Sequence, residues 1–358
     1  MKKHSLRVLA PDASLLSRRQ FLGYTAGAIL AMCIPGCVSS SQRRLNIYNY
    51  SYYIAPDTVK NFINQTGISV VYDEFSSQDV LFAKLKLGAG YDLIVASDYM
   101  LRRLIRQQII ATIDGFKYYE QMIDLVKKEP LSSLCRYCVP YLWGTTGIGY
   151  NRKYVKNTPT SWADLWNEDY VGRVTMLDEK RDAIGAALIK LGYNGNSCHP
   201  KELAAAQKEL IHQKHILRQY TNDYIDGLAR GEIWLAQAWS GDISRAQEAN
   251  PNIDYILPKE GSFFFVDSWC IPQDAAHKSE AVEFLNFVMQ PEIIAKVTNF
   301  TSYPNTIATS LPYVNQELLN RPLGYPPAEM MKRTFAQEDI GAEEKNWDKM
   351  WESIKFKN

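Results

Sequence analysis

The sequence lacks the short motifs by which many enzyme active sites are recognised. It contains no GxSxG, HExxH or P-loop pattern. Histidine is scarce, with five in 358 residues, and none of them falls in the acidic and aromatic segments described below. The acid pair Glu179 and Asp182 could serve glycoside hydrolysis, but a carboxylate-based hydrolase is the least favoured interpretation. We therefore predict no catalytic residues, no cofactor and no metal site.

The sequence also lacks a marked excess of either charge. The net charge is +1, and residues 1–37 hold five Lys or Arg and one Asp. From totals of 40 basic and 39 acidic residues, the rest of the chain keeps 35 basic and 38 acidic side chains. A nucleic-acid-binding protein needs a basic face, so we expect no nucleic-acid partner. With 46% hydrophobic residues, the chain is long enough for two core-forming domains.

Cysteine is infrequent, with six in the chain. Cys135 and Cys138 form a CxxC pattern, but no second CxxC or nearby histidine pair completes a zinc site. The pattern does not stand at the start of a βαβ unit either, as it would in a thioredoxin. We interpret these cysteines as structural or incidental, and a disulfide is allowed if the protein lies outside the cytoplasm.

The apolar run near the N-terminus, "YTAGAILAMCI" (24–34), is short for a membrane-spanning helix. It follows "SRRQFLG" (17–23), which resembles a twin-arginine export motif, and it leads into "IPGC", which resembles a lipobox ending at Cys37. We predict a signal peptide over residues 1–37, lipidation of Cys37, and a folded part tethered outside the inner membrane. A plain N-terminal anchor helix is the alternative.

Strand and helix patterns alternate between residues 44 and 108, which favours an α/β domain with a mostly parallel sheet. The predicted strands span 44–50, 68–75 and 91–97, and the predicted helices span 56–67, 77–90 and 98–108. In a second set, the predicted strands span 140–151, 172–178 and 262–272, and the predicted helices span 182–193 and 200–215. Residues 220–242 are predicted to form a helix, a glycine stop, a strand and a polar tip, and residues 279–297 a pair of helices split by Pro291.

Acidic and aromatic residues follow several of these strands. Ligands of open α/β sheets bind beyond the carboxyl ends of the strands, and the segments there are 49–53, 97–99, 178–182, 239–242 and 265–269. The acids that we single out there are Glu179, Asp182, Asp242 and Asp267, and Arg181 is a base among them. Carboxylates anchor ammonium groups, while rings attract cations and cover an alkyl stem. The pattern therefore indicates a polyamine, a flexible alkyl chain with terminal ammonium groups.

Asp267 is the most informative of the four acids. It lies within "SFFFVDSWCIP" (262–272), where apolar residues surround it. An isolated buried carboxylate is costly unless a positive group meets it. No basic residue is close in sequence, and a cationic ligand is one answer.

Several segments resemble, in their order and their amino-acid sequences, the spermidine/putrescine-binding proteins, which are the extracytoplasmic receptors of polyamine ABC importers. The resemblance runs from about residue 44 to the C-terminus. The segments that carry it are "YNYSYYIAPDTVKNF", "YDLIVASDYM", "PYLWGTTGIGYN", "SWADLW", "KLGYNG", "AWSGD", "PKEGSFFFVDSWCIP" and "EFLNFVMQPEI".

The resemblance implies a two-lobed periplasmic-binding-protein fold of the type II-like class, with the ligand in the interlobe cleft. It places lobe 1 over 44–142 plus 267–311 and lobe 2 over 143–266 plus 312–358. It also implies a monomer that delivers its ligand to an inner-membrane ABC permease. The "GTTGIG" glycines then belong to a strand near the hinge and not to a nucleotide loop.

The resemblance further implies a set of ligand contacts. An aromatic box falls on Tyr50, Tyr53, Trp239, Phe265 and Tyr303. Polar contacts to an amine fall on Ser51, Ser97, Tyr99 and Gln337, and amine-binding acids fall on Glu179, Asp182, Asp242 and Asp267. Tyr52 departs from the family, which usually has an acid there, so the preferred polyamine stays open.

Each of these residues also has a structural interpretation. The rings could pack in the core, and Ser97 and Tyr99 could simply start a helix. Asp182 could cap the helix that follows it, while Glu179 and Asp242 could be loop or turn acids. Gln337 rests on the resemblance alone. The ligand could also be another cationic solute, or ferric iron held by the adjacent tyrosines.

Overall fold

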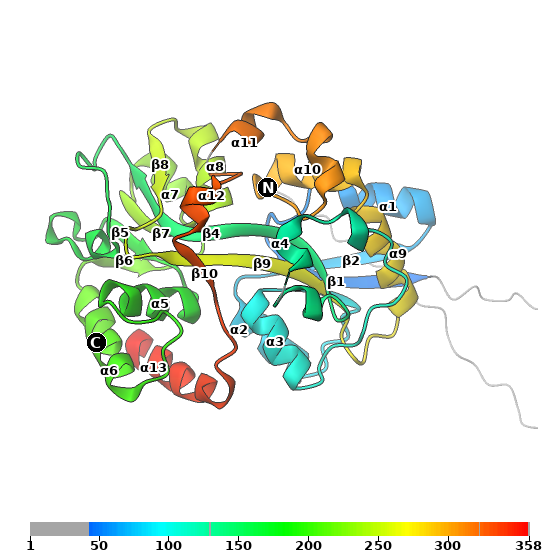
Figure 1. Ribbon diagram of the computed structural model, residues 1–358, viewed down its shortest axis with the longest axis horizontal. Coiled ribbons are helices and arrows are strands. Elements are labelled where there is room, and N and C mark those ends of the chain that lie inside the picture. The colour runs from blue at the N-terminus through cyan, green and yellow to red at the C-terminus, as the bar shows by residue number, and fades with distance from the viewer. Residues whose placement is uncertain (1–42, 129, 322, 357–358) are drawn as a thin grey trace, which may run out of the picture. The chain divides into compact units, whose positions relative to one another are not determined.

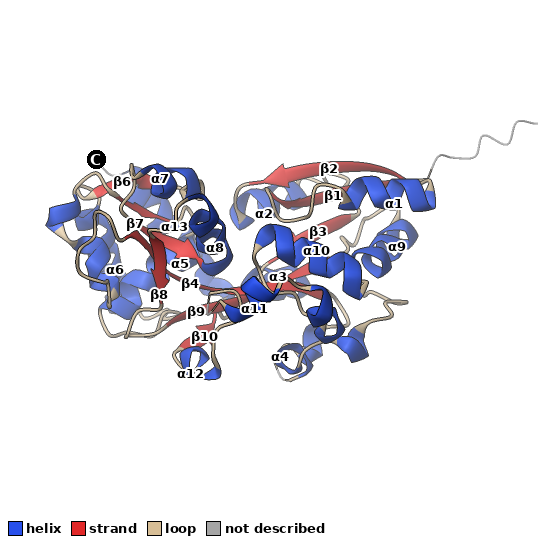
Figure 2. Ribbon diagram, turned by 90° about the horizontal axis from the view of Figure 1, so that it is seen from above, coloured by secondary structure: helices blue, strands red, loops and turns tan. Residues whose placement is uncertain are grey.

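Two long antiparallel strands, β4 (Val139–Asn151) and β9 (Ser262–Cys270), run through the middle of the structure and join its two halves (Figures 1 and 2). This computed structural model describes residues 43–128, 130–321 and 323–356. The predicted signal peptide and Cys37 lie outside the described residues.

The other strands lie on either side of this pair in one sheet of order β2-β1-β3-β9-β4-β7-β5-β6, to which β8 and β10 add through β4 and β9. Their bounds are β1 Arg44–Tyr50, β2 Ser69–Phe75, β3 Leu93–Ala96, β5 Val174–Met176, β6 Leu217–Tyr220, β7 Leu235–Trp239, β8 Ile253–Ile256 and β10 Thr334–Ala336. β1, β2 and β3 are parallel, as are β5, β6 and β7.

Helices connect the parallel strands and cover the sheet. The larger ones are α1 Thr58–Thr66, α2 Gln78–Lys86, α3 Asp98–Arg106, α5 Lys180–Lys190, α6 Pro200–Gln213, α8 Ser240–Ala249, α9 Lys278–Val288, α10 Pro291–Thr301 and α13 Glu344–Phe356. The short ones are α4 Asp124–Lys127, α7 Ile225–Arg230, α11 Gln316–Asn320 and α12 Ala328–Met331. Among the described residues, no helix is both long enough and apolar enough to cross a bilayer.

The sequence signals for helix ends are confirmed at several positions. Ser77 caps α2, because its side chain accepts the Val80 backbone N–H. Gly67 ends α1 in the left-handed conformation, with φ of 72°. Pro291 occupies the first turn of α10 and separates it from α9.

Two predictions about elements are wrong in detail. Residues 240–242 are not a polar tip but the first turn of α8. Residues 265–269 do not follow a strand, because they lie inside β9. β9 continues past Asp267 since its two ends pair with different partners, β10 at one end and β3 at the other.

The hydrophobic core is divided between the two halves. Two clusters draw their buried residues from 45–143 and 266–307 and make up what we call the first lobe. Two others draw theirs from 148–263 and 347–354 and make up the second lobe. The residue-level lobe boundaries given by the sequence stay predictions, and the packing of Val314 and Leu318 against Ala295 favours a third crossing later than residue 311.

Candidate functional site

A cavity of about 700 Å³ lies where elements of both lobes meet. All the predicted ligand-contact residues, from Tyr50 to Gln337, line it. They come from the loop after β1, the N-terminal turns of α3, α5 and α8, the middle of β9, and the segments that follow α10 and β10. The sequence thus identified residues that the fold brings together, while their roles toward a ligand stay predictions.

Carboxylates dominate the charge of this cavity. Among the described residues that line it, seven are acids and one, Arg245, is a base. Two of the acids, Asp182 and Asp242, lie in the first turns of α5 and α8. Helix N-termini carry partial positive charge, which offsets a part of the repulsion between acids held close together.

Asp267 lies in the middle of the cavity wall with 4% of its surface exposed. The Tyr53 hydroxyl donates a 2.7 Å hydrogen bond to Oδ2, and Oδ1 has no hydrogen-bond partner. No described Lys or Arg forms an ion pair with it. Burial raises the pKa of Asp267 to about 7. The described part of the chain therefore leaves this buried carboxylate without a counter-charge.

Glu179 and Asp182 form the second acidic group, on α5. Oε1 of Glu179 accepts the Gln78 backbone N–H at 3.2 Å, and Asp182 accepts the Thr146 hydroxyl at 2.7 Å. Burial raises the pKa of both, well above the usual range for Glu179 and to about 6 for Asp182. Asp182 caps no helix, because α5 begins two residues before it.

Asp242 is satisfied by two hydroxyls. Tyr224 and Tyr303 each donate to its carboxylate at 2.9 Å. Burial still raises its pKa, and these two hydrogen bonds lower it again in part. Asp242 is therefore a partly compensated acid that also orients the Tyr303 ring.

The aromatic side chains of the cavity contact one another. The Tyr53 ring lies 5.5 Å from the Tyr50 ring and 5.3 Å from the Tyr303 ring, both in edge-to-face geometry. Phe265 lies 6.2 Å from Tyr303. Trp239, at the end of β7, lines the cavity half-buried. These rings give an apolar wall suited to an alkyl stem.

Two glycines let the rings approach the backbone. A Cβ on Gly241 would lie 2.5 Å from Cδ2 of Tyr303. A Cβ on Gly144 would lie 2.9 Å from Cζ of Phe265. Both distances are shorter than real Cβ contacts, so glycine is required at these positions for the observed ring placement.

The predicted polar contacts also face the cavity. The side-chain oxygens of Ser97 and Tyr99 are buried and have no hydrogen-bond partner, which is unusual for buried polar atoms. Ser51 lies in the exposed turn after β1. Gln337 is buried and hydrogen-bonds Asp182, which lowers the Asp182 pKa.

The basic residues next to the acids on α5 point away from the cavity. Lys180 forms ion pairs with Asp79 at 2.8 Å and Glu344 at 2.9 Å. Arg181, fully buried, lies 3.9 Å from Glu344 and donates to Asn196 at 2.7 Å. Neither residue lines the cavity. α13, which carries Glu344, therefore holds both cations behind the acids.

Arg245 is a cavity residue that the sequence analysis missed. Its guanidinium lies 5.1 Å from the centre of the Tyr52 ring and 5.9 Å from that of Phe300. Its position three residues after Asp242 in α8 places it on the same helix face, but this signal required α8 to be recognised as a helix. Gln78, Asp178, Asp223 and Asp226 were missed as well.

The structure also shows the geometry of the adjacent tyrosines, which could have held ferric iron, and of the CxxC cysteines. Tyr52 is 65% exposed and lies under Arg245, whereas the Tyr53 hydroxyl is committed to Asp267. The adjacent tyrosines therefore do not present their hydroxyls as a pair. The Cys138 thiol is buried, and its pKa is raised well above the usual value by the hydrogen bond with Cys135 and by burial.

Comparison with known proteins places this geometry in a family. The family model for bacterial extracellular solute-binding proteins matches residues 57–318. The spermidine/putrescine-binding periplasmic protein of Escherichia coli is 32% identical over 92% of this chain and 97% of its own length. The putrescine-binding periplasmic protein SpuD of Pseudomonas aeruginosa is 35% identical over 91% and 97%.

A solved structure has the same fold. The crystal structure of the lipoprotein TpPotD of Treponema pallidum superimposes with a TM-score of 0.78 at 28% identity, covering 88% of this chain and 100% of that one. The fold is thus the type II-like periplasmic-binding-protein fold expected from the sequence.

Proposed function

The chain belongs to the family of bacterial extracellular solute-binding proteins, and we propose that it captures a polyamine, such as putrescine or spermidine, and delivers it to an ABC permease. The names of its relatives in Escherichia coli and Pseudomonas aeruginosa support this ligand class. Membership of a family of transport receptors also supports a binding role over an enzymatic one.

One observation carries the proposal. Asp267 is buried among rings, its Oδ1 has no partner, and no described cation neutralises it. An ammonium group at this point would supply both the missing hydrogen bond and the missing charge. The rings around it would cover the methylene groups that follow. Micromolar affinity corresponds to about −8 kcal/mol, which a few such contacts plus ring burial can provide.

Tyr53 has a defined part in this scheme. Its hydroxyl donates to Oδ2 of Asp267 at 2.7 Å, so Oδ1 is the atom that would accept the ammonium. The Tyr53 ring would in turn contact the adjoining methylene groups, since it lies between the rings of Tyr50 and Tyr303. Glu179, Asp182 and Asp242 would hold further amines of a longer polyamine.

The receptor role carries three further predictions from the sequence. The protein acts outside the inner membrane, as the periplasmic relatives do by their names. Cys37 carries a lipid that tethers it there, a proposal supported by the related lipoprotein of Treponema pallidum. The protein works as a monomer, and closure of its two lobes on the ligand is the signal that the permease reads.

Calorimetric titration with putrescine, spermidine and spermine tests the proposal. We expect at least one of them to bind with micromolar or tighter affinity. Asp267→Asn should weaken that binding tenfold or more, about 1.4 kcal/mol, without loss of folding.

Asp114→Asn is the matched control, because Asp114 is exposed and does not line the cavity. Its affinity should equal that of the unaltered protein. If no polyamine produces heat or a thermal shift, the proposed ligand class is wrong. If Asp267→Asn binds as tightly as Asp114→Asn, the role of Asp267 is wrong.

A further inference from the structure

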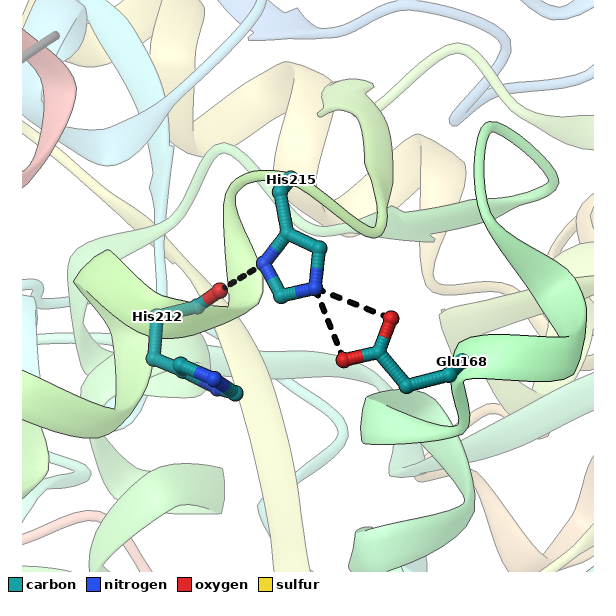
Figure 3. Close-up of side chains that lie close together, drawn as sticks. All are labelled: Glu168, His212 and His215. Carbon is teal, nitrogen blue, oxygen red and sulfur yellow. Dashed lines mark hydrogen bonds and ion pairs between the residues drawn. The ribbon is translucent and has the colours of Figure 1, made fainter.

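Two histidines and one glutamate meet on the surface of the second lobe (Figure 3). Glu168 begins a short 3₁₀ helix, Glu168–Tyr170, His212 lies in the last turn of α6, and His215 follows that helix. One donor atom from each of the three lies within 4.8 Å of the others. All three are exposed, and none of them lines the cavity described above.

The hydrogen bonds of His215 determine which of its nitrogens is free to bind a metal. Nδ1 lies 2.5 Å from the His212 backbone carbonyl oxygen. A carbonyl can only accept, so Nδ1 carries a proton and donates. Metal-binding histidines commonly use one nitrogen in this way, which fixes the ring and leaves the other nitrogen as the ligand.

The free nitrogen of His215 faces the Glu168 carboxylate. Nε2 lies 2.8 Å from Oε1 and 3.0 Å from Oε2. An unprotonated ring nitrogen and an ionised carboxylate are both electron-pair donors, so a cation must lie between them. That cation is either a proton on Nε2 or a metal ion bound by both groups.

His212 supplies a second imidazole to the same place. Its ring centre lies 5.0 Å from that of His215, at an angle of 76°. The C-terminal end of α6, with its partial negative charge, also favours a cation here. Lys214 is close in sequence, but its ammonium donates to the backbone oxygens of Ile354 and Lys355.

We propose that Glu168, His212 and His215 form a binding site for a divalent transition-metal ion, with Zn²⁺ as the typical case and water completing the coordination. Two imidazoles and one carboxylate suit Zn²⁺ and its neighbours, whereas Mg²⁺ and Ca²⁺ require oxygen ligands. Around a tetrahedral Zn²⁺ with bonds of about 2.1 Å, donor atoms lie about 3.4 Å apart. The three donor atoms lie within 4.8 Å of one another, and because the side chains are exposed, they have room to rotate toward that spacing when an ion binds.

The sequence alone gave no sign of this site, because Glu168 lies far from the two histidines along the chain. A bound ion would join the 168–170 helix to the end of α6. We therefore expect Zn²⁺ to raise the melting temperature, since a ligand that binds only the folded state stabilises it.

The test is a calorimetric and thermal-shift titration of the full chain, without a histidine tag, with Zn²⁺ and with Mg²⁺. We expect Zn²⁺ to bind and Mg²⁺ to give no heat. His212→Ala and His215→Ala should each weaken Zn²⁺ binding at least tenfold. His199→Ala is the matched control, because His199 is an exposed histidine at the other end of α6 and its loss should leave the affinity unchanged.

The cysteine pair Cys135 and Cys138 is the competing explanation for any Zn²⁺ that binds. The proposal is overturned if Zn²⁺ does not bind, if binding survives both histidine substitutions, or if Cys135→Ser/Cys138→Ser abolishes it. Polyamine titration of the same histidine variants should give unchanged affinities. A failure at this metal site is thereby separable from a failure of the proposed transport role.

Discussion

At the scale of single residues, the cavity is defined by acids that the chain leaves poorly neutralised. Asp267 has an oxygen without a partner, and the pKa of Asp267, Glu179 and Asp182 is raised by burial in each case. A protein that binds no cation would have little reason to bury such groups. An ammonium ligand would remove the free-energy cost of burying these carboxylates when it binds. The same carboxylates would therefore also make the cavity selective for positively charged ligands.

These raised pKa values predict that polyamine affinity depends on pH. In the ligand-free protein Asp267 has a pKa of about 7, so it is mostly protonated at pH 5.5. A bound ammonium favours the ionised form, and binding at that pH must first release the proton. We expect the affinity to rise roughly tenfold or more between pH 5.5 and pH 8, measured by calorimetry in buffers of different ionisation enthalpy to count the protons.

The raised pKa of Asp267 has the opposite effect on the stability of the ligand-free protein, which falls as the pH rises. A carboxyl whose folded pKa is raised stabilises the fold below its unfolded pKa near 4, and this contribution is lost as the pH rises through about 7. The melting temperature without ligand should therefore fall more steeply over that range than in Asp267→Asn. An affinity that stays constant from pH 5.5 to 8 would contradict the assignment of Asp267.

Residue patterns could identify the acids and rings of the cavity but not the directions of all side chains. Lys180 and Arg181 stand between Glu179 and Asp182 in sequence, and nothing local shows that the two basic side chains turn toward Glu344. That outcome depends on α13, which lies more than 150 residues later. Arg245 was missed for a similar reason, because its role depends on a helix that the sequence pattern did not reveal.

At the scale of elements, the helix–strand alternation was predictable because periodicity and end signals agreed. Ser77, Gly67 and Pro291 mark helix ends by local chemistry, and the structure has them where expected. The three-residue strand β10 exists only through pairing with β9, a contact that no local pattern encodes. α8 was not predicted because the sequence of its first helical turn, Ser240–Gly241–Asp242, is also typical of a loop between two elements.

One methyl group added to Gly241, in the first turn of α8, should affect both stability and ligand binding. Gly241→Ala would place Cβ within 2.5 Å of the Tyr303 ring, so the ring must move away from Asp242 and from the cavity. We expect a loss of about 1–3 kcal/mol in stability, measured by denaturant unfolding, and a clearly weaker polyamine affinity.

Gly172→Ala separates these two effects. Gly172 has φ of +71° and open space around its Cβ direction, and it does not line the cavity. The alanine should cost about 1 kcal/mol in backbone strain and leave the affinity unchanged. If Gly241→Ala loses stability but binds polyamine normally, the Tyr303 ring takes no part in the site.

At the scale of the whole molecule, ion pairs join the two lobes beside the cavity. Arg103 of α3, in the first lobe, lies 3.4 Å from Glu344 of α13, in the second. Lys180 of α5 reaches Asp79 of α2 across the same boundary. If the lobes close on the ligand as proposed, these contacts form on closure and would add to the stability of the closed form without touching the ligand.

Arg103→Gln should therefore weaken polyamine binding only by lowering the population of the closed form, because Arg103 does not line the cavity. The Arg103 and Glu344 side chains are 12% and 6% exposed, so the pair is shielded from solvent and we expect a loss of about three- to tenfold in affinity. Small-angle X-ray scattering should show a smaller radius of gyration with putrescine present, and Arg103→Gln should need more putrescine to reach it.

Arg102→Gln is the control on the same helix, because Arg102 forms no ion pair with any described residue. It should bind and close as the unaltered protein does. A scattering profile that is the same with and without a polyamine shown to bind by calorimetry would exclude lobe closure as the signal to the permease.

Glu344 has a consequence for the end of the chain. It holds Lys180 and Arg181 behind the acids of α5. A chain that ends before this residue would lose α13, and with it Trp347, Trp351 and Ile354 from the core of the second lobe, while Asp79 would remain as a partner of Lys180. The shortened product would contain every cavity residue through Gln337 but not the helix that packs behind α5, so a complete set of binding residues would not by itself make a working receptor.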